Sequence, residues 1–380
     1  MTESFTFDMK KAGWMRFIPA VSFASILVAG FAVTMTSLRD VAEKDWAGMS
    51  EPRRILEGES TRRFSTQLNS HFLLSKPFAH IERAVTWGIA GDTGTSVRTG
   101  CDGWLFLADE LTPYPAAKQN ALARADIVTK LDSVLKKRGI QLVMAVVPDK
   151  SRIEHSHLCG LHRSPGFADR VDDWITPLRQ QKIEVIDLRV ALNETPGERY
   201  YRTDSHWNES GADSAARAIA QRLQALHLVD KPASPIPSGA IQSRMVERSG
   251  DLIRVANFDG LPAWLRPPAD TTQQSTVAPV SVASDDLFGD TGLPTVALVG
   301  TSFARASNFV PLLSQFLGAP VANMAKDGGD FEGSAMAYLS SKAYQKEPPK
   351  VLLWEVPERM LQKPLTRSEQ IWSQFLSKNR

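Results

Sequence analysis

Two short segments of the 380-residue sequence carry the residue types that serine-based acyl chemistry needs. In residues 299–303, a glycine, a threonine and Ser302 follow directly on the end of a predicted apolar strand. In residues 203–206, Asp204 stands two positions before His206. A serine becomes a nucleophile when a histidine accepts its proton and a carboxylate orients that histidine. We therefore predict Ser302 as the nucleophile, His206 as the general base and Asp204 as the orienting group.

Each segment also has a simpler interpretation. Ser302 could serve only as the cap of a following helix. Residues 203–208 could be the polar entrance to a helix that begins near Glu209 and has Asn208 as its N-cap. The two segments together favour catalysis, because both fall at strand ends or helix starts of one predicted sheet. In open α/β sheets, functional groups gather beyond the carboxyl ends of the strands.

Donors for a developing oxyanion are expected among backbone N–H groups and amide side chains near the nucleophile. Phe303 offers a backbone N–H directly after Ser302. Asn323, Gly328 and Gly329 follow the next predicted strand, and glycine lets a backbone approach a reacting oxygen closely. These four residues are the oxyanion candidates. The alternative for the residues after 323 is an ordinary strand-to-helix turn.

The elements that must position these residues alternate between strand and helix. Short apolar runs predict buried strands, and apolar residues at helical spacing predict the helices between them. The predicted strands are residues 140–147, 183–188, 295–299, 321–324 and 351–356, and helices are predicted around 127–135, 171–178, 212–223 and 309–317. This alternation predicts an α/β fold with a parallel sheet flanked by helices.

We assign the catalytic domain to residues 96–362. Within it, residues 231–294 break the alternation and are rich in proline, with threonine and serine between the prolines. An irregular insertion is therefore expected there. Residues 363–380 are expected to form a C-terminal tail helix.

The compartment is indicated by the N-terminal segment. Residues 17–38 contain no charged residue and are long enough to cross a bilayer as a helix. Basic residues at positions 10, 11 and 16 precede this span, which predicts a transmembrane signal anchor with residues 1–16 in the cytoplasm. A cleaved signal peptide is the alternative, and in both cases the remaining chain is exported. Residues 39–95 are predicted to form a helical lead-in.

Charge and cysteine content narrow the possible functions further. The formal net charge is +2 and no Lys/Arg-rich run is present, so no nucleic-acid partner is expected. Cys101 and Cys159 could form one disulfide in an oxidising compartment, or remain two free thiols. Histidines at 155, 157 and 162 lie near Cys159 without a metal-ligand spacing. We expect neither a metal nor another cofactor.

Five short motifs occur in one order along the chain: GWLF at 103–106, VPDK at 147–150, TDSHW at 203–207, GTSF at 300–303 and WEVPER at 354–359. Together they resemble the alginate O-acetyltransferase family, AlgJ and AlgX in particular, over roughly residues 95–362. The resemblance implies an SGNH-hydrolase-like fold of circularly permuted order, with the Asp-x-His segment before the serine. It implies the same roles for Ser302, His206 and Asp204. The anchored N-terminus is more similar to AlgJ, and no counterpart of the additional C-terminal carbohydrate-binding module of AlgX is expected.

The resemblance also implies a reaction and its partners. It implies transfer of acetyl groups to hydroxyls of an exopolysaccharide, alginate or a related polymer, through an acetyl-serine intermediate. A membrane-bound O-acyltransferase is the implied acetyl-donor partner, and the implied location is the inner membrane, single-pass, with the catalytic domain in the periplasm. Two alternatives stay open: a polysaccharide acetylesterase with the same triad, and a non-catalytic scaffold of a polysaccharide synthesis complex.

Side chains that could bind the acceptor are named by their place in these motifs. The candidates are Trp207, Arg305, Glu355 and Arg359. Trp207 stands beside His206, where an indole ring could stack on a sugar. Trp104 and Trp354 are interpreted as core residues instead.

Overall fold

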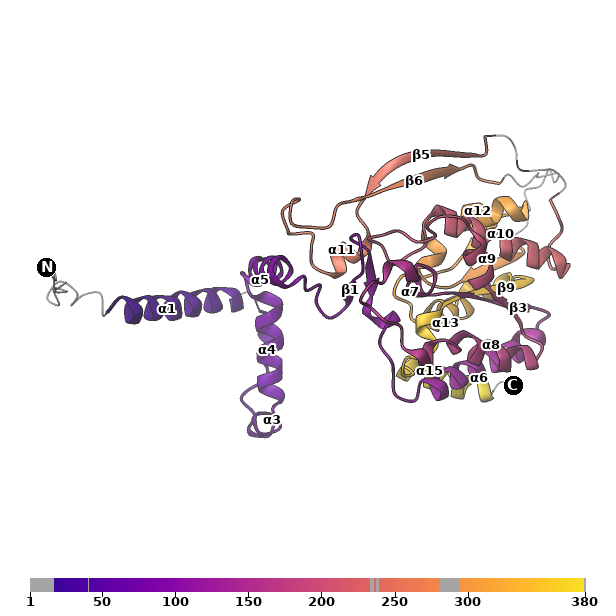
Figure 1. Cartoon of the computed structure of the whole chain (residues 1–380). Coiled ribbons are helices and arrows are strands. Elements are labelled where there is room, and N and C mark those ends of the chain that lie inside the picture. Colours follow the sequence, from indigo (N-terminus) through magenta and orange to yellow (C-terminus); the bar gives the residue numbers. More distant parts are fainter. Residues whose placement is uncertain (1–16, 40, 233–235, 237–238, 281–293, 379–380) are drawn as a thin grey trace, which may run out of the picture. The chain divides into compact units, whose positions relative to one another are not determined.

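The structure is a computed structural model that describes residues 17–39, 41–232, 236, 239–280 and 294–378 (Figure 1). It divides into two compact units, one ending at Ala90 and the other beginning at Gly91. The boundary falls at the glycine-rich turn where the helical lead-in is expected to end. The predicted cytoplasmic segment, residues 1–16, lies outside the described residues.

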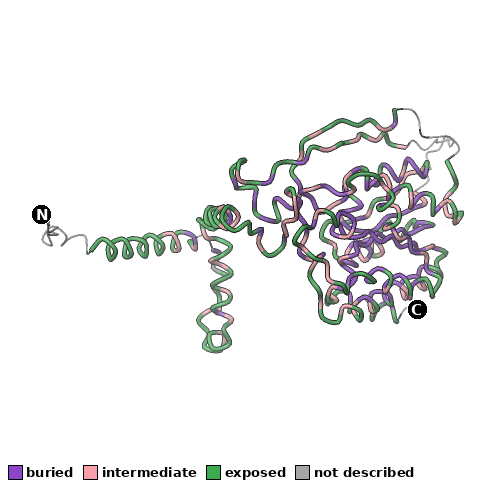
Figure 2. The backbone as a smooth tube through the Cα atoms, viewed as in Figure 1, coloured by how far each residue is buried: buried purple, intermediate pink, exposed green. Residues whose placement is uncertain are grey.

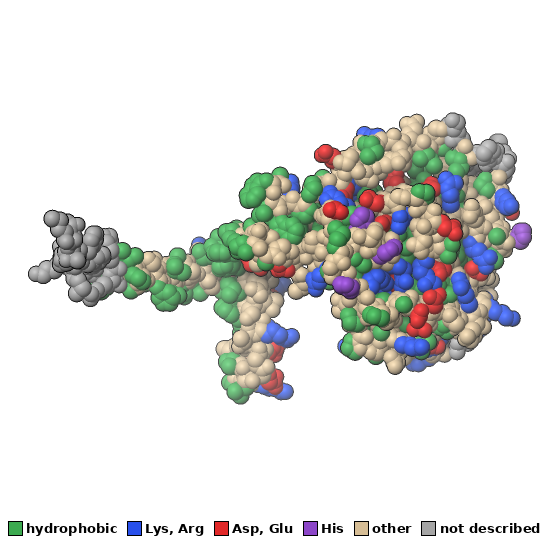
Figure 3. Space-filling model, in the orientation of Figure 1, with side chains coloured by type: hydrophobic (Ala, Val, Ile, Leu, Met, Phe, Trp, Pro, Cys, Tyr) green, Lys and Arg blue, Asp and Glu red, His purple; other side chains and the backbone are tan. Residues whose placement is uncertain are grey.

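The N-terminal unit is helical. Its first helix, α1, spans Ile18–Leu38, and its most apolar window has a mean hydropathy of 2.0 and no buried residue. Apolar side chains therefore cover the outside of this helix (Figures 2 and 3). A helix of 21 residues with such a surface is long enough to cross a bilayer. The helices that follow are α2 (Glu43–Trp46), α3 (Pro52–Leu56), α4 (Glu59–His71) and α5 (Ser75–Ala90).

The C-terminal unit is built on a five-stranded parallel sheet. Its strands are β3 (Gln141–Val147), β4 (Glu184–Asp187), β7 (Val296–Val299), β8 (Val321–Asn323) and β9 (Val351–Pro357). Their order across the sheet is β4-β3-β9-β7-β8, and each neighbouring pair is parallel. These are the five strands expected from the apolar runs. Because parallel strands end at the same edge, the residues after β7, β8 and β9 lie close together.

Helices cover both faces of this sheet (Figure 1). One face packs against α9 (Leu188–Glu194), α10 (Glu209–Ala225) and α12 (Phe309–Leu317). The other face packs against α6 (Ala117–Lys136), α8 (Arg170–Gln180), α13 (Gly333–Leu339), α14 (Lys342–Lys346) and α15 (Arg367–Lys378). Successive residues of β3 enter the two cores in turn, with Val143 and Ala145 on one face and Met144 and Val146 on the other. Burial on both faces explains the continuous apolar runs in the sequence (Figure 2).

The segment expected to be an irregular insertion contains regular structure. β5 (Ile241–Arg248) and β6 (Asp270–Val277) form an antiparallel ribbon, and α11 (Asp251–Val255) lies in the connection between them. Most side chains of the two strands are exposed or half-buried and polar, so the apolar alternation that reveals a strand is missing. Residues 233–235, 237–238 and 281–293 of this segment lie outside the described residues.

A buried ionic cluster joins two of the five sequence motifs. Asp149 follows β3 and Glu358 follows β9, and both carboxylates accept hydrogen bonds from Arg163 and Arg170. Arg152 also donates to Glu358, at 2.6 Å. The two carboxylates are at most 1% exposed. Since β3 and β9 are neighbours, the cluster ties together the carboxyl ends of the central strands.

The predicted tail helix, α15, is attached to the sheet unit by a buried ion pair. Arg124 of α6 donates from Nε to Glu369 Oε1 of α15 at 2.6 Å, and both side chains are at most 1% exposed. The same guanidinium donates to the carbonyls of Leu361 and Lys363, just before the helix. The helix is therefore part of the packed α/β unit.

Cys101 and Cys159 form a disulfide. Cys101 lies in the turn between β1 (Val97–Thr99) and β2 (Leu105–Leu107), which form a separate antiparallel pair. The two Cα atoms are 5.6 Å apart, and the Cys101 N–H donates to the carbonyl of His157 at 2.9 Å. The bond therefore fastens the β1–β2 turn to the segment after α7 (Lys150–Ile153).

Loss of this disulfide is expected to lower the free energy of unfolding by ~3–5 kcal/mol, because the bond restricts the unfolded chain. The cysteines are 58 residues apart, so the closed loop is long. Denaturation of a Cys101→Ser/Cys159→Ser double variant beside the wild type measures the difference. Non-reducing mass mapping should show a peptide that contains both cysteines. Two freely alkylated thiols would contradict the bond.

Candidate active site

Ser302 is the first residue of a short 3-10 turn, Ser302–Arg305, directly beyond the carboxyl end of β7. Thr301 is the N-cap of this turn, and its backbone N–H donates to Glu355 Oε2 at 2.6 Å. A Cβ atom on Gly300 would lie 2.5 Å from the same oxygen, so a side chain there would displace Glu355. Glu355 is buried at the end of β9 and supports the turn that carries Ser302. This burial disagrees with the acceptor-binding role expected from the sequence.

Ser302, His206 and Asp204 form a chain of hydrogen bonds, in which His206 and Ser302 are 96 residues apart in sequence. His206 Nε2 lies 2.6 Å from Ser302 Oγ, and His206 Nδ1 lies 2.7 Å from Asp204 Oδ1. Asp204 Oδ1 also accepts from the backbone N–H of His206 at 3.0 Å. Asp204 is buried, whereas Ser302 and His206 are half-buried. The structure therefore brings the three predicted catalytic residues together, with the distances that proton transfer from Oγ requires. We call residues 203–206 the catalytic loop.

The second oxygen of the Asp204 carboxylate is held by groups outside the catalytic loop. Asp204 Oδ2 accepts from Arg248 Nη2 at 2.8 Å and from the backbone N–H of Asp251 at 3.2 Å. Burial favours the neutral acid, but the hydrogen bond from His206 and the charges of His206 and Arg248 outweigh it. Together they hold the pKa of Asp204 below its usual value. Asp204 therefore stays ionised and can stabilise an imidazolium.

Asp204, His206 and Asp251 are also the group to consider as metal ligands, because one ligand atom from each lies within 4.8 Å of the others. The ligand atoms are already engaged, however. His206 Nδ1 pairs with Asp204, and both oxygens of Asp251 accept from Ser205. The guanidinium of Arg248 beside Asp204 also repels a cation. The group fits a hydrogen-bonded catalytic loop better than a metal centre.

Two of the oxyanion candidates lie beside the nucleophile. The Phe303 N–H donates to Thr301 Oγ1 at 3.3 Å, and Asn323 Nδ2 donates to the carbonyl of Ala304 at 3.4 Å. The first N–H groups of a helical turn have no acceptor within the turn, so the Ser302 N–H is a further donor at this place. The sequence prediction did not name it. The Ser302 N–H therefore joins the Asn323 amide among the candidate donors to an oxyanion.

The two glycine candidates lie in the segment that follows β8. The segment after β8 is attached to the nucleophile turn, because the Lys326 N–H donates to the carbonyl of Gly300 at 3.1 Å. Gly328 is exposed, and the Gly329 N–H donates to the carbonyl of Lys326. These glycines shape a strand-to-helix turn, which was the alternative interpretation of this motif.

Two acceptor-binding candidates, Trp207 and Arg359, pack against the ring of Phe303. Trp207 has no exposed surface and packs between the rings of Phe303 and Phe309, at centroid distances of 5.1 and 4.9 Å. Neighbouring residues of an extended segment point in opposite directions, so a position beside His206 turns the indole inward. It holds the nucleophile turn against α12 and cannot stack on a sugar. Arg359 is 12% exposed and lies over the Phe303 ring at 5.2 Å.

A polar cleft of about 600 Å³ lies beside His206. It is lined by the catalytic loop, by the β5–β6 ribbon and by the residues that follow Ser302. Of the four predicted acceptor-binding residues, Arg305 lines this cleft. Hydroxyl, amide and carboxyl groups also line it, from Tyr201, Glu209, Thr272, Gln274, Ser307 and Asn308. Such a lining beside a serine nucleophile suits a ligand rich in hydroxyl groups.

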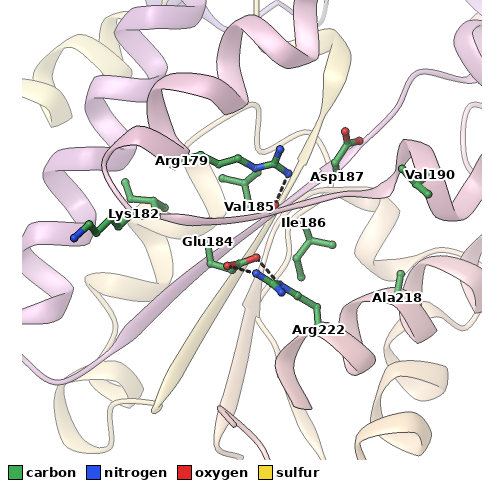
Figure 4. A pocket seen from close by; sticks show the side chains of 10 residues that line it. Arg179, Lys182, Glu184, Val185, Ile186, Asp187, Val190, Ala218 and Arg222 are labelled. Atoms are coloured by element: carbon green, nitrogen blue, oxygen red, sulfur yellow. Dashed lines mark hydrogen bonds and ion pairs between the residues drawn. The ribbon is translucent and has the colours of Figure 1, made fainter. Parts of the chain in front are cut away.

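A second hollow, of about 740 Å³, runs along the edge strand β4 (Figure 4). Its two arginines donate to other groups of the wall. Arg222 donates to both carboxylate oxygens of Glu184, at 2.7 and 2.8 Å, and Arg179 donates to the carbonyl of Val185 at 3.2 Å. The hollow shares no lining residue with the cleft at His206. Although its volume is larger than that of the cleft, we therefore assign it no part in the chemistry of Ser302.

The buried carboxyl group of Glu355 should make the free energy of unfolding depend on pH. Burial raises the pKa of Glu355 to about 7, although hydrogen bonds from Thr301 oppose the change. Because this pKa lies above the ordinary value of 4.5, the contribution of Glu355 to stability is complete below about pH 4.5 and is lost as the pH rises through about 7. Glu355→Gln cannot ionise and should lose less stability than the wild type between pH 5 and pH 8, by up to about 3 kcal/mol.

Urea unfolding of the full chain in detergent at the two pH values measures this difference. Glu347→Gln changes an exposed carboxylate and is the control. Equal losses of stability in the wild type and in Glu355→Gln would contradict the shifted pKa of Glu355.

The sheet topology and the geometry at its carboxyl edge define a class of protein. The chain is an SGNH-hydrolase-like α/β enzyme of the acetyltransferase kind, with the Asp-x-His segment before the serine in sequence. The family is defined as well. A family model described as "SGNH hydrolase-like domain, acetyltransferase AlgX" matches residues 97–358, and the chain belongs to this family.

Relatives and solved structures agree with this assignment. "Probable alginate O-acetylase AlgJ" of Pseudomonas aeruginosa is 31% identical over 320 residues, 81% of this chain and 81% of that protein. "Alginate biosynthesis protein AlgX" of Pseudomonas syringae pv. tomato is 31% identical over 291 residues, 73% of this chain and 58% of that protein. The structure of the O-acetyltransferase domain of Pseudomonas putida AlgJ matches with a TM-score of 0.63 and 29% identity, over 75% of this chain and 99% of that chain. The family and fold class predicted from the five motifs are confirmed.

Proposed function

We propose that the chain is a periplasmic O-acetyltransferase that passes acetyl groups through an ester of Ser302 to hydroxyls of an exopolysaccharide, alginate or a related polymer. The observation that carries the proposal is the chain of hydrogen bonds from Ser302 through His206 to Asp204, beside a polar cleft. The names of the AlgJ and AlgX relatives support the choice of polymer.

In the first half-reaction, Ser302 takes the acetyl group from its donor. His206 Nε2 accepts the Oγ proton while Oγ attacks the acetyl carbonyl carbon, and Asp204 stabilises the imidazolium. The Ser302 N–H and the Asn323 amide are the proposed donors to the oxyanion. The proton on His206 then passes to the leaving group of the donor. Acetyl-Ser302 and a neutral imidazole remain.

In the second half-reaction, a sugar hydroxyl takes the acetyl group. His206 removes the hydroxyl proton as the sugar oxygen attacks the ester, and Ser302 Oγ leaves with that proton. Water at about 55 M competes for the ester, but a well-oriented hydroxyl reaches an effective molarity of roughly 10⁵ M or more. The polar groups of the cleft are the proposed means of holding the sugar in that orientation.

The apolar helix α1 supports a location at the inner membrane. We propose that α1 is a single-pass anchor, with residues 1–16 in the cytoplasm and the unit from Gly91 onward in the periplasm. The disulfide agrees with an oxidising compartment. A membrane-bound O-acyltransferase is the proposed source of acetyl groups, and anchoring would keep Ser302 close to it.

Transfer is tested with the full chain in detergent, a chromogenic acetyl ester as donor and an exopolysaccharide oligomer as acceptor. Mass spectrometry should show the oligomer with the added mass of one acetyl group, and this product should be lost in Ser302→Ala. Because transfer and hydrolysis share the acetyl-Ser302 ester, the ratio of acetylated oligomer to free acetate separates them. Acetate as the sole product with every oligomer, together with increased polymer acetylation in cells that lack the gene, would show an esterase.

A further inference from the structure

The β5–β6 insertion, residues 241–277, contacts three successive residues of the catalytic loop, each through a different side chain. Three side chains make these contacts: Asp270 Oδ2 accepts from the N–H and Oγ1 of Thr203 at 3.0 and 2.7 Å, Arg248 Nη2 donates to Asp204 Oδ2 at 2.8 Å, and Asp251 accepts from the N–H and Oγ of Ser205 at 2.7 and 2.6 Å. A loop outside regular structure thereby receives a fixed position from residues that are distant in sequence.

The insertion also touches the loop backbone to backbone. A Cβ atom on Gly250 would lie 2.1 Å from the Thr203 carbonyl oxygen and 2.5 Å from the Asp204 nitrogen, which leaves room only for glycine. The Gly250 N–H donates to Thr203 Oγ1 at 3.1 Å, and the Leu252 N–H donates to the Thr203 carbonyl at 3.2 Å. The insertion and the catalytic loop therefore form one packed unit.

Two residues of the insertion reach the triad itself, Asp251 and Arg248, and of these Arg248 carries the positive charge. Arg248 is the last residue of β5, its side chain is 36% exposed, and its guanidinium lies over the Tyr201 ring at 4.0 Å. The carboxylate of Asp204 is thus held from two sides, by His206 at Oδ1 and by Arg248 at Oδ2. Rotation of the carboxylate would break one of these bonds, so Arg248 restricts the position of the group that orients His206.

The same part of the insertion forms a wall of the polar cleft. Val246, Glu247, Arg248, Thr272 and Gln274 of the ribbon line it, together with His206. An acceptor that occupies the cleft would therefore contact the element that fixes Asp204.

We propose that Arg248 is a positioning residue of the active site, which fixes the Asp204 carboxylate and through it His206, and which connects the acceptor cleft to the triad. The inference rests on the proposed function in that it assigns catalysis to Ser302. The inference gives the β5–β6 insertion a second role besides forming a wall of the cleft. The three residues of the triad come from other segments of the chain, and Arg248 of the insertion holds Asp204 in position.

The charges that face His206 come from four elements. Asp204 belongs to the catalytic loop, Asp251 to α11, Arg248 to β5 and Glu355 to β9. Arg248 is the cation among these four, and it lies beside the carboxylate that orients His206. Its removal changes the charge around the catalytic loop and should displace the pH profile of kcat/KM. A role in folding alone would not produce this displacement.

The test compares Arg248→Ala and Arg248→Lys with Arg244→Ala, which removes an exposed arginine from the same strand. Cleavage of a chromogenic acetyl ester by the full chain in detergent is measured across pH, and thermal unfolding checks the fold. Arg248→Ala should lower kcat by about 10²-fold with little change in KM, because misplaced catalytic groups cost about that much. Arg248→Lys keeps the charge and should lie between Arg248→Ala and the wild type. Millimolar guanidinium chloride, but not sodium chloride, should restore part of the activity of Arg248→Ala.

Several results would overturn the inference. Activity of Arg248→Ala equal to that of Arg244→Ala would remove the role of Arg248, as would a loss with no displacement of the pH profile and no rescue by guanidinium. If Arg248→Ala does not fold, the Arg248→Lys variant decides the question. Activity of Arg248→Lys equal to that of the wild type at every pH would show that the guanidinium of Arg248 is not required. An inactive wild type would reject the proposed function and this inference together, whereas an active wild type with an unaffected Arg248→Ala rejects this inference alone.

Discussion

Replacing Ser302 or His206 by alanine is expected to lower kcat for acetyl transfer by about 10⁴- to 10⁶-fold without unfolding the chain. Ser302 Oγ is the atom that would carry the acetyl group, and His206 Nε2, at 2.6 Å, is the group that would remove its proton. Because each residue is useless without the other, the double variant should be no slower than either single variant. Asp204→Ala should cost somewhat less, since Asp251 Oδ2 remains 3.6 Å from His206 Nδ1.

The controls are a serine and a histidine of the same unit. Ser314→Ala changes a half-buried serine of α12, and His162→Ala changes an exposed histidine between α7 and α8. Both variants should retain activity within about twofold of the wild type, because surface substitutions away from special features have small effects. Intact-mass measurement should also detect an acetylated wild-type chain, and no such adduct on Ser302→Ala. Near-normal turnover in Ser302→Ala would remove the nucleophile assignment.

The sequence predicts the sheet well because its strands are buried on both faces. Each strand is a short apolar run, and α/β alternation together with the five motifs leads to the correct fold class. The β5–β6 ribbon has no such signal. Its strands are paired through their backbones, and their exposed polar side chains resemble those of a loop. The prolines in this segment strengthen that impression, so the sequence predicts irregular structure where a ribbon exists.

The site divides in the same way. Ser302, His206 and Asp204 can be predicted because chemistry restricts their residue types and their motifs are short. Arg248 and Asp251 cannot, since they reach Asp204 from more than 40 positions away, and no spacing rule connects them. For Trp207 the sequence prediction fails in the other direction, because it names a binding residue that is buried. The position beside His206 indicates a site residue, but the direction of the backbone turns the side chain into the core.

Lys150 is a further residue whose importance follows from contacts and not from spacing. Its Nζ donates to the carbonyls of Leu105, Arg202 and Asp204, at 2.5, 2.9 and 3.0 Å, and its side chain is fully buried. Burial lowers the pKa of Lys150 to about 8, against the charges of Glu110 and Asp204 that raise it, so the group remains an ammonium near neutral pH. An ammonium has three donors, and each has its own acceptor here. Lys150 thereby ties the catalytic loop to β2.

Lys150→Met is accordingly expected to destabilise the chain by about 3 kcal/mol or more and to lower kcat by about 10- to 100-fold. Methionine fills much of the space of the lysine stem but removes a donor from three carbonyls. The Arg202 carbonyl still accepts from the Leu105 N–H at 3.0 Å, so the cost of about 1–3 kcal/mol each applies to the carbonyls of Leu105 and Asp204. Relief from burying a charge offsets part of this cost. The kinetic loss follows because the carbonyl of Asp204, two residues from His206, is no longer held.

The matched control is Lys137→Met, which changes an exposed lysine and should alter the free energy of unfolding by less than about 0.5 kcal/mol. Urea unfolding and acetyl-ester cleavage by both variants separate the two expected effects. A stable but slow Lys150→Met would mean that the three hydrogen bonds give little net stability and serve mainly to position the loop. If both variants match the wild type in stability and rate, Lys150 does not hold the loop, and the contacts of the β5–β6 insertion are sufficient to keep Asp204 and His206 in place.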